Sequence, residues 1–164
     1  MDNTQQMPPE RHIGAVNWVG LGTLYGKECR RFFKVWLQTI VAPTITSMLF
    51  LAVFSLALGR AVPEIGGVSF LQFMAPGLIV MAMMQNAFAN TSSSLMISKV
   101  QGNVVDVLMP PLSPGELLIG FAMGGVSRGL VVAVVLSLVM LPFVHLEVHH
   151  FGFLLVHAFA SSMM

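Results

Sequence analysis

The chain has 164 residues, of which 55% are hydrophobic and 9% are charged, and its mean hydropathy is +0.81. Ordinary soluble domains carry about a quarter charged residues, so this composition argues against a soluble enzyme. The net charge of +1 provides no basic field that would hold a nucleic acid, and the single cysteine, Cys29, can form neither an internal disulfide nor a zinc site.

The first predicted element is an amphipathic helix over 18–35, which follows an N-terminal stretch, 1–17, that we expect to be flexible. Plotted at 100° per residue, one sector of this helix collects apolar and aromatic side chains, namely Trp18, Leu21, Tyr25, Cys29, Phe32 and Trp36. The opposite side collects the basic side chains Lys27, Arg30, Arg31 and Lys34. This arrangement is typical of a helix that lies in the headgroup layer of a membrane. The alternative is a solvated basic flank that only fixes the topology.

Long uncharged runs predict the next two helices, because a bilayer core about 30 Å thick needs roughly 20 apolar residues of helix. The 25 uncharged residues of 35–59 predict a transmembrane helix over about 36–58. The 34 uncharged residues of 65–98 predict a second helix over about 70–94. We expect the pair Pro76-Gly77 to bend or break this second helix near its outer end.

The C-terminal part predicts two more helices. Residues 117–146 are interrupted only by Arg128 and predict a third transmembrane helix over about 115–141. A fourth helix over 151–164 would be roughly 21 Å long, which is too short to cross a bilayer. We therefore expect a truncated fourth helix and interpret the chain as a fragment of a longer membrane protein.

The distribution of Lys and Arg predicts the orientation in the membrane. The side that holds the N-terminus and the loop 95–114 has six of them, Arg11, Lys27, Arg30, Arg31, Lys34 and Lys99. The opposite loops hold only Arg60. Because basic residues concentrate on the cytoplasmic side, the N-terminus and the loop 95–114 are predicted to be cytoplasmic.

The cytoplasmic loop contains a short predicted helix whose residues Val100, Val104, Val107 and Leu108 share one face at helical spacing. A helix this short is unstable alone, so it should dock on a partner, such as a groove in a cytoplasmic protein. The alternative is that the loop rests on its own bilayer surface. The residues predicted to couple to a partner are Val100, Gln101, Gly102, Asn103, Val104, Asp106, Val107 and Leu108.

Polar side chains inside the predicted spans mark either a substrate path or helix packing. Asn86, Asn90 and Ser94 lie on one face by their i, i+4 spacing. They could line a substrate route or a subunit contact, or form ordinary interhelical hydrogen bonds worth about 0.6 kcal/mol each. Arg128 costs about 2.5–3.5 kcal/mol near mid-membrane, so we expect it to face a wet cavity, to meet Asn86 or Asn90, or to snorkel. The candidate residues are Gln85, Asn86, Asn90, Ser94 and Arg128.

The third helix contains two adjoining small-xxx-small frames, Gly120 to Gly124 and Gly125 to Gly129, which predict close helix packing. Residues 125–129 (GVSRG) also fit the G-x-S-x-G pattern of serine hydrolases. That motif needs a strand-to-helix elbow, which the interior of an apolar helix does not provide, so we predict no catalytic residue.

The residues argue against two further kinds of site, a metal site and a phosphate-binding loop. His145, Glu147 and His149 alternate in a short outer loop, but they have no second cluster beside them, so no metal site is predicted. The Gly26-Lys27 pair is followed by Glu28 and does not form a phosphate-binding P-loop, so this chain is not itself an ATPase.

Several segments together resemble the membrane subunit of bacterial ABC-2 type transporters. The resemblance covers about 20–140, and its most specific part is the polar loop. The matching segments are 24–33 (LYGKECRRFF), 41–43 (VAP), 54–60 (FSLALGR), 75–78 (APGL), 85–94 (QNAFANTSSS) and 99–116 (KVQGNVVDVLMPPLSPGE).

The resemblance implies an all-α integral membrane protein of the bacterial cytoplasmic membrane that exports drugs, lipids or polysaccharides by alternating access. Members of this family have six helices per subunit, form dimers, and pair with separate subunits that bind ATP and Mg. Residues 100–109 would then be the coupling helix. The sequence departs from the family in lacking the end of helix 4 and helices 5 and 6. The rival interpretation is a truncated, non-transporting membrane anchor or regulatory subunit. An ion channel would need rings of charge or a filter loop, which the sequence does not show.

Overall fold

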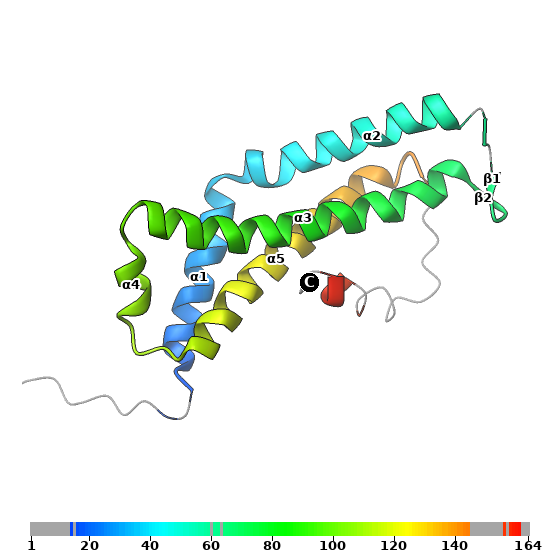
Figure 1. Ribbon diagram of the computed structural model, residues 1–164. Coiled ribbons are helices and arrows are strands. Elements are labelled where there is room, and N and C mark those ends of the chain that lie inside the picture. Colours follow the sequence, from blue (N-terminus) through cyan, green and yellow to red (C-terminus); the bar gives the residue numbers. More distant parts are fainter. Residues whose placement is uncertain are drawn as a thin grey trace, which may run out of the picture.

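A computed structural model shows three long helices that run lengthwise beside one another and a fourth helix that lies across them (Figure 1). Three helical segments are long and apolar enough to cross a membrane, namely Leu37–Leu58, Phe70–Val100 and Pro114–Met140. The predicted all-α membrane fold is thereby confirmed. The residues that the structure describes are 14, 16–59, 61–62, 64–144, 156 and 158–161.

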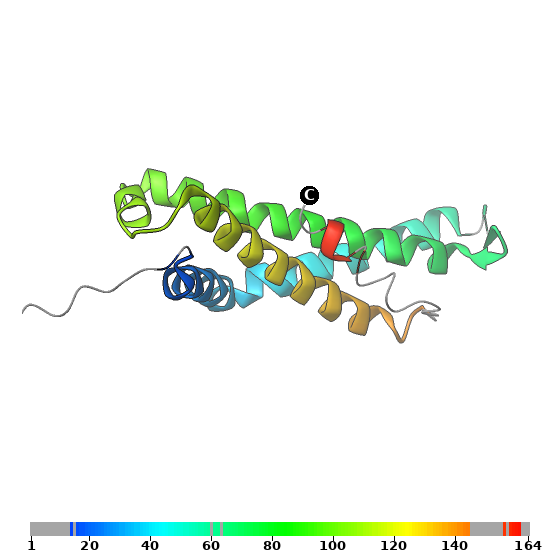
Figure 2. The same ribbon diagram turned by 90° about the horizontal axis from the view of Figure 1, so that it is seen from below.

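Helix α1 (Trp18–Lys34) is the amphipathic element at the N-terminus. The side chain of Asn17 caps it by accepting a hydrogen bond from the backbone N–H of Gly20 at 2.9 Å. Its axis runs across α3 and α5, so Figure 2 shows α1 almost end-on while those two helices are seen lengthwise. The chain leaves the helix at Val35 (φ −115°, ψ 39°), and Trp36 therefore lies beyond the helix and does not share its apolar sector as predicted.

The first membrane span has a π-helical start. The π-helical turn η1 (Leu37–Val41) leads into α2 (Ala42–Leu58), which together lie close to the predicted range 36–58. Pro43 lacks a backbone N–H and cannot bond the carbonyl of Thr39, so the regular hydrogen-bond ladder is interrupted at this place. The sequence predicted the span but not its altered start.

A short hairpin links α2 to the second span at the end of the bundle opposite α4 (Figure 1). Strands β1 (Glu64–Ile65) and β2 (Val68–Ser69) pair antiparallel. The two-residue turn between them uses Gly66 (φ +59°) and Gly67 (φ +84°), a conformation that glycine adopts without strain.

Helix α3 (Phe70–Val100) is longer than predicted. It continues six residues past the expected end at 94, and the serines in this part are accommodated in the helix. Ser92 and Ser98 donate from their hydroxyls to the carbonyls of Phe88 and Ser94, at 2.8 and 2.9 Å, and remain compatible with the helix. The helix also continues through Pro76 instead of breaking there, since a proline near the N-terminal end removes only one internal hydrogen bond.

Two helices complete the described fold. Gly102 (φ +73°) turns the chain after α3, and the short α4 (Val104–Leu108) follows. Helix α5 (Pro114–Met140) begins at a capping box formed by Ser113 and Glu116 and lies close to the predicted 115–141. Of the predicted truncated fourth helix, 151–164, only residue 156 and residues 158–161 are described, and they are helical.

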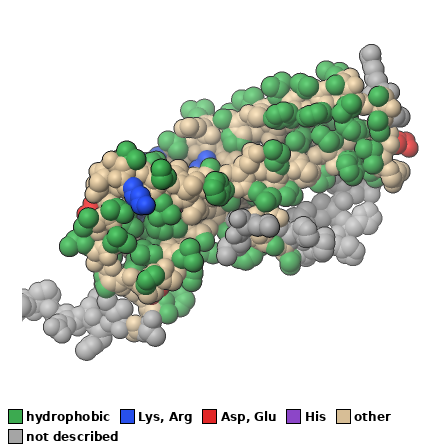
Figure 3. Space-filling model, in the orientation of Figure 1, with side chains coloured by type: hydrophobic (Ala, Val, Ile, Leu, Met, Phe, Trp, Pro, Cys, Tyr) green, Lys and Arg blue, Asp and Glu red, His purple; other side chains and the backbone are tan. Residues whose placement is uncertain are grey.

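Helices α2, α3 and α5 bury a core in the half of the bundle near the hairpin. Its buried members are Leu51, Ala75, Ala82, Val132, Leu136, Met140 and Val144. Exposed hydrophobic side chains cover much of the face shown in Figure 3, as expected for helices surrounded by lipid. On the face shown there, Lys and Arg atoms of the described residues occur only in the half that contains α4.

Candidate functional site

The site of interest lies at the α4 end of the bundle, where α1, α4 and α5 meet. Val107 of α4 packs against Leu24 of α1 and Phe121 of α5, and all three side chains are buried. Leu112 and Leu117 complete this group, which we call the α4 cluster. Val107 therefore connects α4 to both α1 and α5.

The start of α1 is also tied to the segment that follows α4. The backbone N–H of Asn17 donates to Oε1 of Glu116, and Nδ2 of Asn17 donates to the carbonyl of Pro111 at 3.2 Å. Glu116 also accepts from the backbone N–H of Ser113 through Oε2 at 2.6 Å. The N-terminus of α1 and the start of α5 are thus held together by polar contacts as well as by the α4 cluster.

The exposed side of α4 differs from the predicted docking face. Val107 was expected to face a partner, but it is buried within the chain itself, and Val100 belongs to the end of α3 instead of to α4. The positive φ of Gly102 separates the two helices, so Val100 cannot continue the face of α4. The apolar side chains that α4 leaves open are Val105, Leu108 and Met109, which are 56, 65 and 78% exposed.

The remaining predicted coupling residues surround this face. Gln101, Gly102 and Asn103 form the exposed turn before α4. Asp106 is exposed on α4 itself, whereas Val104 is half-buried. The α4 end of the molecule therefore presents an apolar patch bordered by polar residues.

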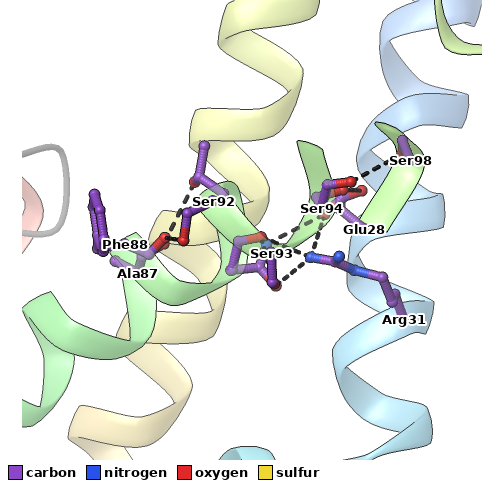
Figure 4. A network of polar contacts seen from close by, with 10 residues as sticks. Glu28, Arg31, Ala87, Phe88, Ser92, Ser93, Ser94 and Ser98 are labelled. Carbon is purple, nitrogen blue, oxygen red and sulfur yellow. Dashed lines mark hydrogen bonds and ion pairs between the residues drawn. The ribbon is translucent and has the colours of Figure 1, made fainter. Parts of the chain in front are cut away.

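A buried polar cluster joins α1 to α3. The carboxylate of Glu28, which is 1% exposed, accepts from Ser94 Oγ at 2.7 Å and from Asn90 Nδ2 at 3.3 Å. Arg31 forms an ion pair with Glu28 at 3.0 Å and also donates to the carbonyl and to Oδ1 of Asn90, at 2.8 and 3.1 Å. Figure 4 shows Arg31 and Glu28 reaching from α1 toward the serines of α3. Glu28, Arg31, Asn90 and Ser94 are called the Glu28 cluster below.

Sequence reasoning missed Glu28 as a site residue. The signal was present, because Glu28 lies one helical turn from Leu24 and one from Phe32, and these three form the buried stripe of α1. A carboxylate on an otherwise apolar stripe requires a partner in the interior. The predicted apolar sector included Trp18, but this side chain is 74% exposed and does not belong to the buried stripe.

The predicted basic side of α1 is divided in the structure. Lys27, Arg30 and Lys34 are exposed, which agrees equally with an interfacial helix and with a solvated basic flank. Arg31 is different, because it turns inward to the Glu28 cluster. Tyr25 is partly exposed, and its hydroxyl lies 2.8 Å from Ser127 Oγ of α5.

Arg128 of α5 meets one of its expected partners. Its Nη2 donates to Oδ1 of Asn86 at 3.1 Å, and Asn86 is buried on α3. The Nε of Arg128 is buried and has no hydrogen-bond partner among the described residues. This guanidinium is therefore only partly satisfied within the described chain.

The other polar residues of α3 have different surroundings. Asn90 and Ser94 form hydrogen bonds between helices, which was one of the two alternatives considered for them. Gln85 is exposed on the outside of α3.

The glycines of α5 allow α1 and α3 to approach closely. A Cβ on Gly124 would lie 2.7 Å from Cβ of Glu28, and one on Gly129 would lie 2.9 Å from the carbonyl oxygen of Met83. The predicted small-xxx-small frames thus occur at the contacts of α5 with both neighbours.

No metal site is visible in the described part of the chain, where no group of three His, Cys, Asp or Glu side chains could hold an ion. His145, Glu147 and His149, which were considered in the sequence, lie outside the described residues.

Three apolar spans, a helix across them and a short helix at one end define a multi-pass membrane protein of the all-α class. The family model for ABC-2 type transporters matches residues 20–164, so the chain belongs to the ABC-2 type transporter family. The resemblance noted in the sequence is thereby confirmed.

Known relatives agree with this assignment. Over 136 residues the chain is 38% identical to the inner membrane transport permease YadH of Escherichia coli strain K12, and the alignment covers 83% of this chain and 53% of that protein. The YadH proteins of E. coli O157:H7 and Shigella flexneri match equally well. The chain spans about half the length of these curated relatives. No solved structure matches it.

Proposed function

We propose that the chain forms part of the permease of an ATP-driven exporter, and that α4 is the element on which a separate ATP-binding subunit docks. One observation carries this proposal: α4 exposes Val105, Leu108 and Met109 while it wedges Val107 between α1 and α5. A short helix with one apolar side anchored and another open is suited to helix-in-groove recognition. The ATP and Mg would be bound by the partner, and this chain would perform no chemistry on the substrate.

The contacts suggest how nucleotide-driven closure reaches the membrane. A push on α4 would be transmitted by Val107 to Leu24 and Phe121. Because Glu28 ties α1 to α3, displacement of α1 would also move α3. The three helices would then shift together, which is what alternating access requires of a packed bundle.

The orientation and partners follow from the same proposal. The N-terminus and α4 would lie in the cytoplasm, because Lys and Arg concentrate on that side. The β1–β2 hairpin would then lie outside, because it occupies the end of the bundle opposite α4 (Figure 1). The membrane would be the bacterial inner membrane, because the similar E. coli protein is an inner membrane transport permease. A second permease copy and membrane lipids would complete the assembly.

The substrate would be a drug, lipid or polysaccharide-type molecule, and Arg128 with Asn86 is the best candidate for its path. These groups lie inside the bundle, and Arg128 retains an unpartnered Nε among the described residues. A partly satisfied cation inside a span is typical of functional positions in membrane proteins.

The docking proposal predicts that Val105→Asp combined with Leu108→Asp abolishes recovery of the ATP-binding subunit with the full-length permease. Burying two carboxylates in an apolar interface costs free energy, and a groove lined by aliphatic side chains provides no partners that would offset this cost. The measurement is co-purification from membranes, with equal permease in the membrane fraction. Val62→Asp with Val68→Asp, exposed at the opposite end, is the matched control and should leave recovery unchanged.

The same experiment separates the two candidate functions. If the ATP-binding subunit is still recovered with the Val105→Asp, Leu108→Asp variant, α4 is not the docking element. If no such subunit is recovered with the unaltered protein, the alternative of a non-transporting membrane anchor or regulatory subunit would be favoured.

Arg128→Ala is expected to lower ATP hydrolysis by the reconstituted full-length complex while membrane insertion stays normal. Removing the charge favours insertion by about 2.5–3.5 kcal/mol, so a loss of activity would not reflect failure to insert. Leu138→Ala, which alters an exposed position on the same helix, serves as the control. Unchanged turnover in Arg128→Ala would reduce this residue to a packing role with Asn86.

A further inference from the structure

The surface of α1 carries two adjoining grooves that the docking proposal does not use. The first is a basic groove of about 570 Å³, lined chiefly by Lys27, Arg30, Arg31 and Lys34. The second is an apolar groove of about 220 Å³ between α1 and α5. Gly22 lines both, so the two grooves meet on the same helix.

The apolar groove is suited to a hydrocarbon chain. From α1 it is lined by Trp18, Leu21 and Tyr25, and from α5 by Ile119 and Met123. Trp18 and Ile119 are 74% and 54% exposed. Aromatic rings at the level of the headgroups and aliphatic side chains beneath them are typical of residues that contact lipid.

The basic groove is suited to an anion. No acidic residue lines either groove among the described residues, since Glu28 on the same helix turns inward to Asn90 and Ser94. Lys27, Arg30 and Lys34 remain exposed. Arg31 lies at the border, because it lines the groove and also pairs with Glu28 at 3.0 Å.

We propose that these two grooves bind one anionic phospholipid of the cytoplasmic leaflet. Its phosphate would lie among Lys27, Arg30 and Lys34, and one acyl chain would follow the apolar groove along α5. Charge complementarity and the shared wall at Gly22 identify this occupant. The inference rests on the proposed placement of α1 in the cytoplasmic headgroup layer, but it requires no ATP-binding subunit.

The site would also place a lipid next to the contacts that join α1 to α3. Arg31 donates to Asn90 and Glu28 from the inner border of the basic groove. A phosphate in the groove would attract the same guanidinium. Occupancy by an anionic lipid would therefore affect how firmly α1 is held on α3.

The two tryptophans of the chain allow a direct test. In Trp36→Phe protein, Trp18 is the remaining tryptophan and lines the apolar groove. The full chain is placed in phosphatidylcholine nanodiscs that contain a small fraction of phosphatidylglycerol with brominated acyl chains. Bromine quenches tryptophan fluorescence on contact, so stronger quenching than by the same fraction of brominated phosphatidylcholine reports selective binding.

We expect the brominated anionic lipid to be enriched at Trp18 by at least about fivefold, since each basic residue near a lipid surface contributes roughly that factor. Lys27→Gln with Arg30→Gln and Lys34→Gln should abolish the preference. Lys99→Gln, a charge removed at the end of α3, is the matched control and should preserve it. Arg31 is left unchanged because it belongs to the Glu28 cluster.

Equal quenching by the two lipids in the unaltered groove would overturn the proposal, and so would a preference that persists in the triple variant. Excess free glycerol phosphate tests the source of the phosphate. It should not relieve quenching if the acyl chain anchors the lipid, and full relief would show a site for a soluble anion instead. Failure of this test with normal recovery of an ATP-binding subunit would leave the transport proposal intact.

Discussion

Glu28→Ala is expected to cause one of the largest losses of stability of any single substitution in the described chain. It removes the acceptor of Ser94 and the ion-pair partner of Arg31 from a buried position. Removing one member of a buried ion pair typically costs about 3–5 kcal/mol. The measurement is the free energy of unfolding in mixed detergent and dodecyl sulfate micelles, followed by circular dichroism.

Two further variants separate the charge from the hydrogen bonds. Glu28→Gln keeps the shape and an acceptor for Ser94, so we expect a clearly smaller loss than for alanine. A double-mutant cycle of Glu28→Ala and Ser94→Ala should give a coupling energy of about 0.5–3 kcal/mol. Glu64→Ala, on the exposed hairpin, should change stability little. A loss in Glu28→Ala no larger than in Glu64→Ala would contradict a stabilising role.

Gly125→Ala is expected to destabilise the contact between α3 and α5 by about 1–3 kcal/mol, which is typical of overpacking. The added Cβ would lie 2.7 Å from Oγ1 of Thr91 and 2.8 Å from the carbonyl oxygen of Ala87. The carbonyl belongs to the backbone of α3, so it can yield only if the two helices separate. The same unfolding measurement applies.

The chain provides a matched control on the same helix. A Cβ on Gly115 would meet nothing within 4 Å, and Gly115→Ala should be neutral or slightly stabilising because alanine favours the helix. Adding Thr91→Ala to Gly125→Ala should restore only part of the loss, because the carbonyl of Ala87 remains in place. Complete restoration would mean that the side chain, and not the backbone, limits the approach.

The spans were predictable because a helix that crosses the hydrocarbon core needs about 20 apolar residues in a row. Uncharged runs of sufficient length predicted the first span, formed by η1 and α2 together, and α5 to within one or two residues. The end of α3 was not predictable in this way. The uncharged run predicted an end near 94, but the serines around this position bond through their hydroxyls to the preceding turn, and the helix continues to Val100.

The sequence predicted which segments form the candidate site, namely α1 and α4, but not which of their side chains contact one another. The pattern of α4 shows an apolar side, but only the positions of Leu24 and Phe121 decide that Val107 points into the chain and not toward a partner. The same holds for Arg31 and Lys34. Both belong to the basic side of α1, and only the placement of Asn90 separates the inward residue from the exposed one.

The length of α3 determines how far α4 lies from the hydrocarbon core. Its 31 residues span about 46 Å, whereas the hydrocarbon core is about 30 Å thick and the whole bilayer with its headgroups about 40–45 Å. In the proposed orientation, a helix of this length that starts at the outer surface would place α4 just beyond the inner headgroups. The proposed ATP-binding subunit would then reach α4 without displacing lipid, and an α3 shortened by one turn, or about 5.4 Å, would place α4 among the headgroups.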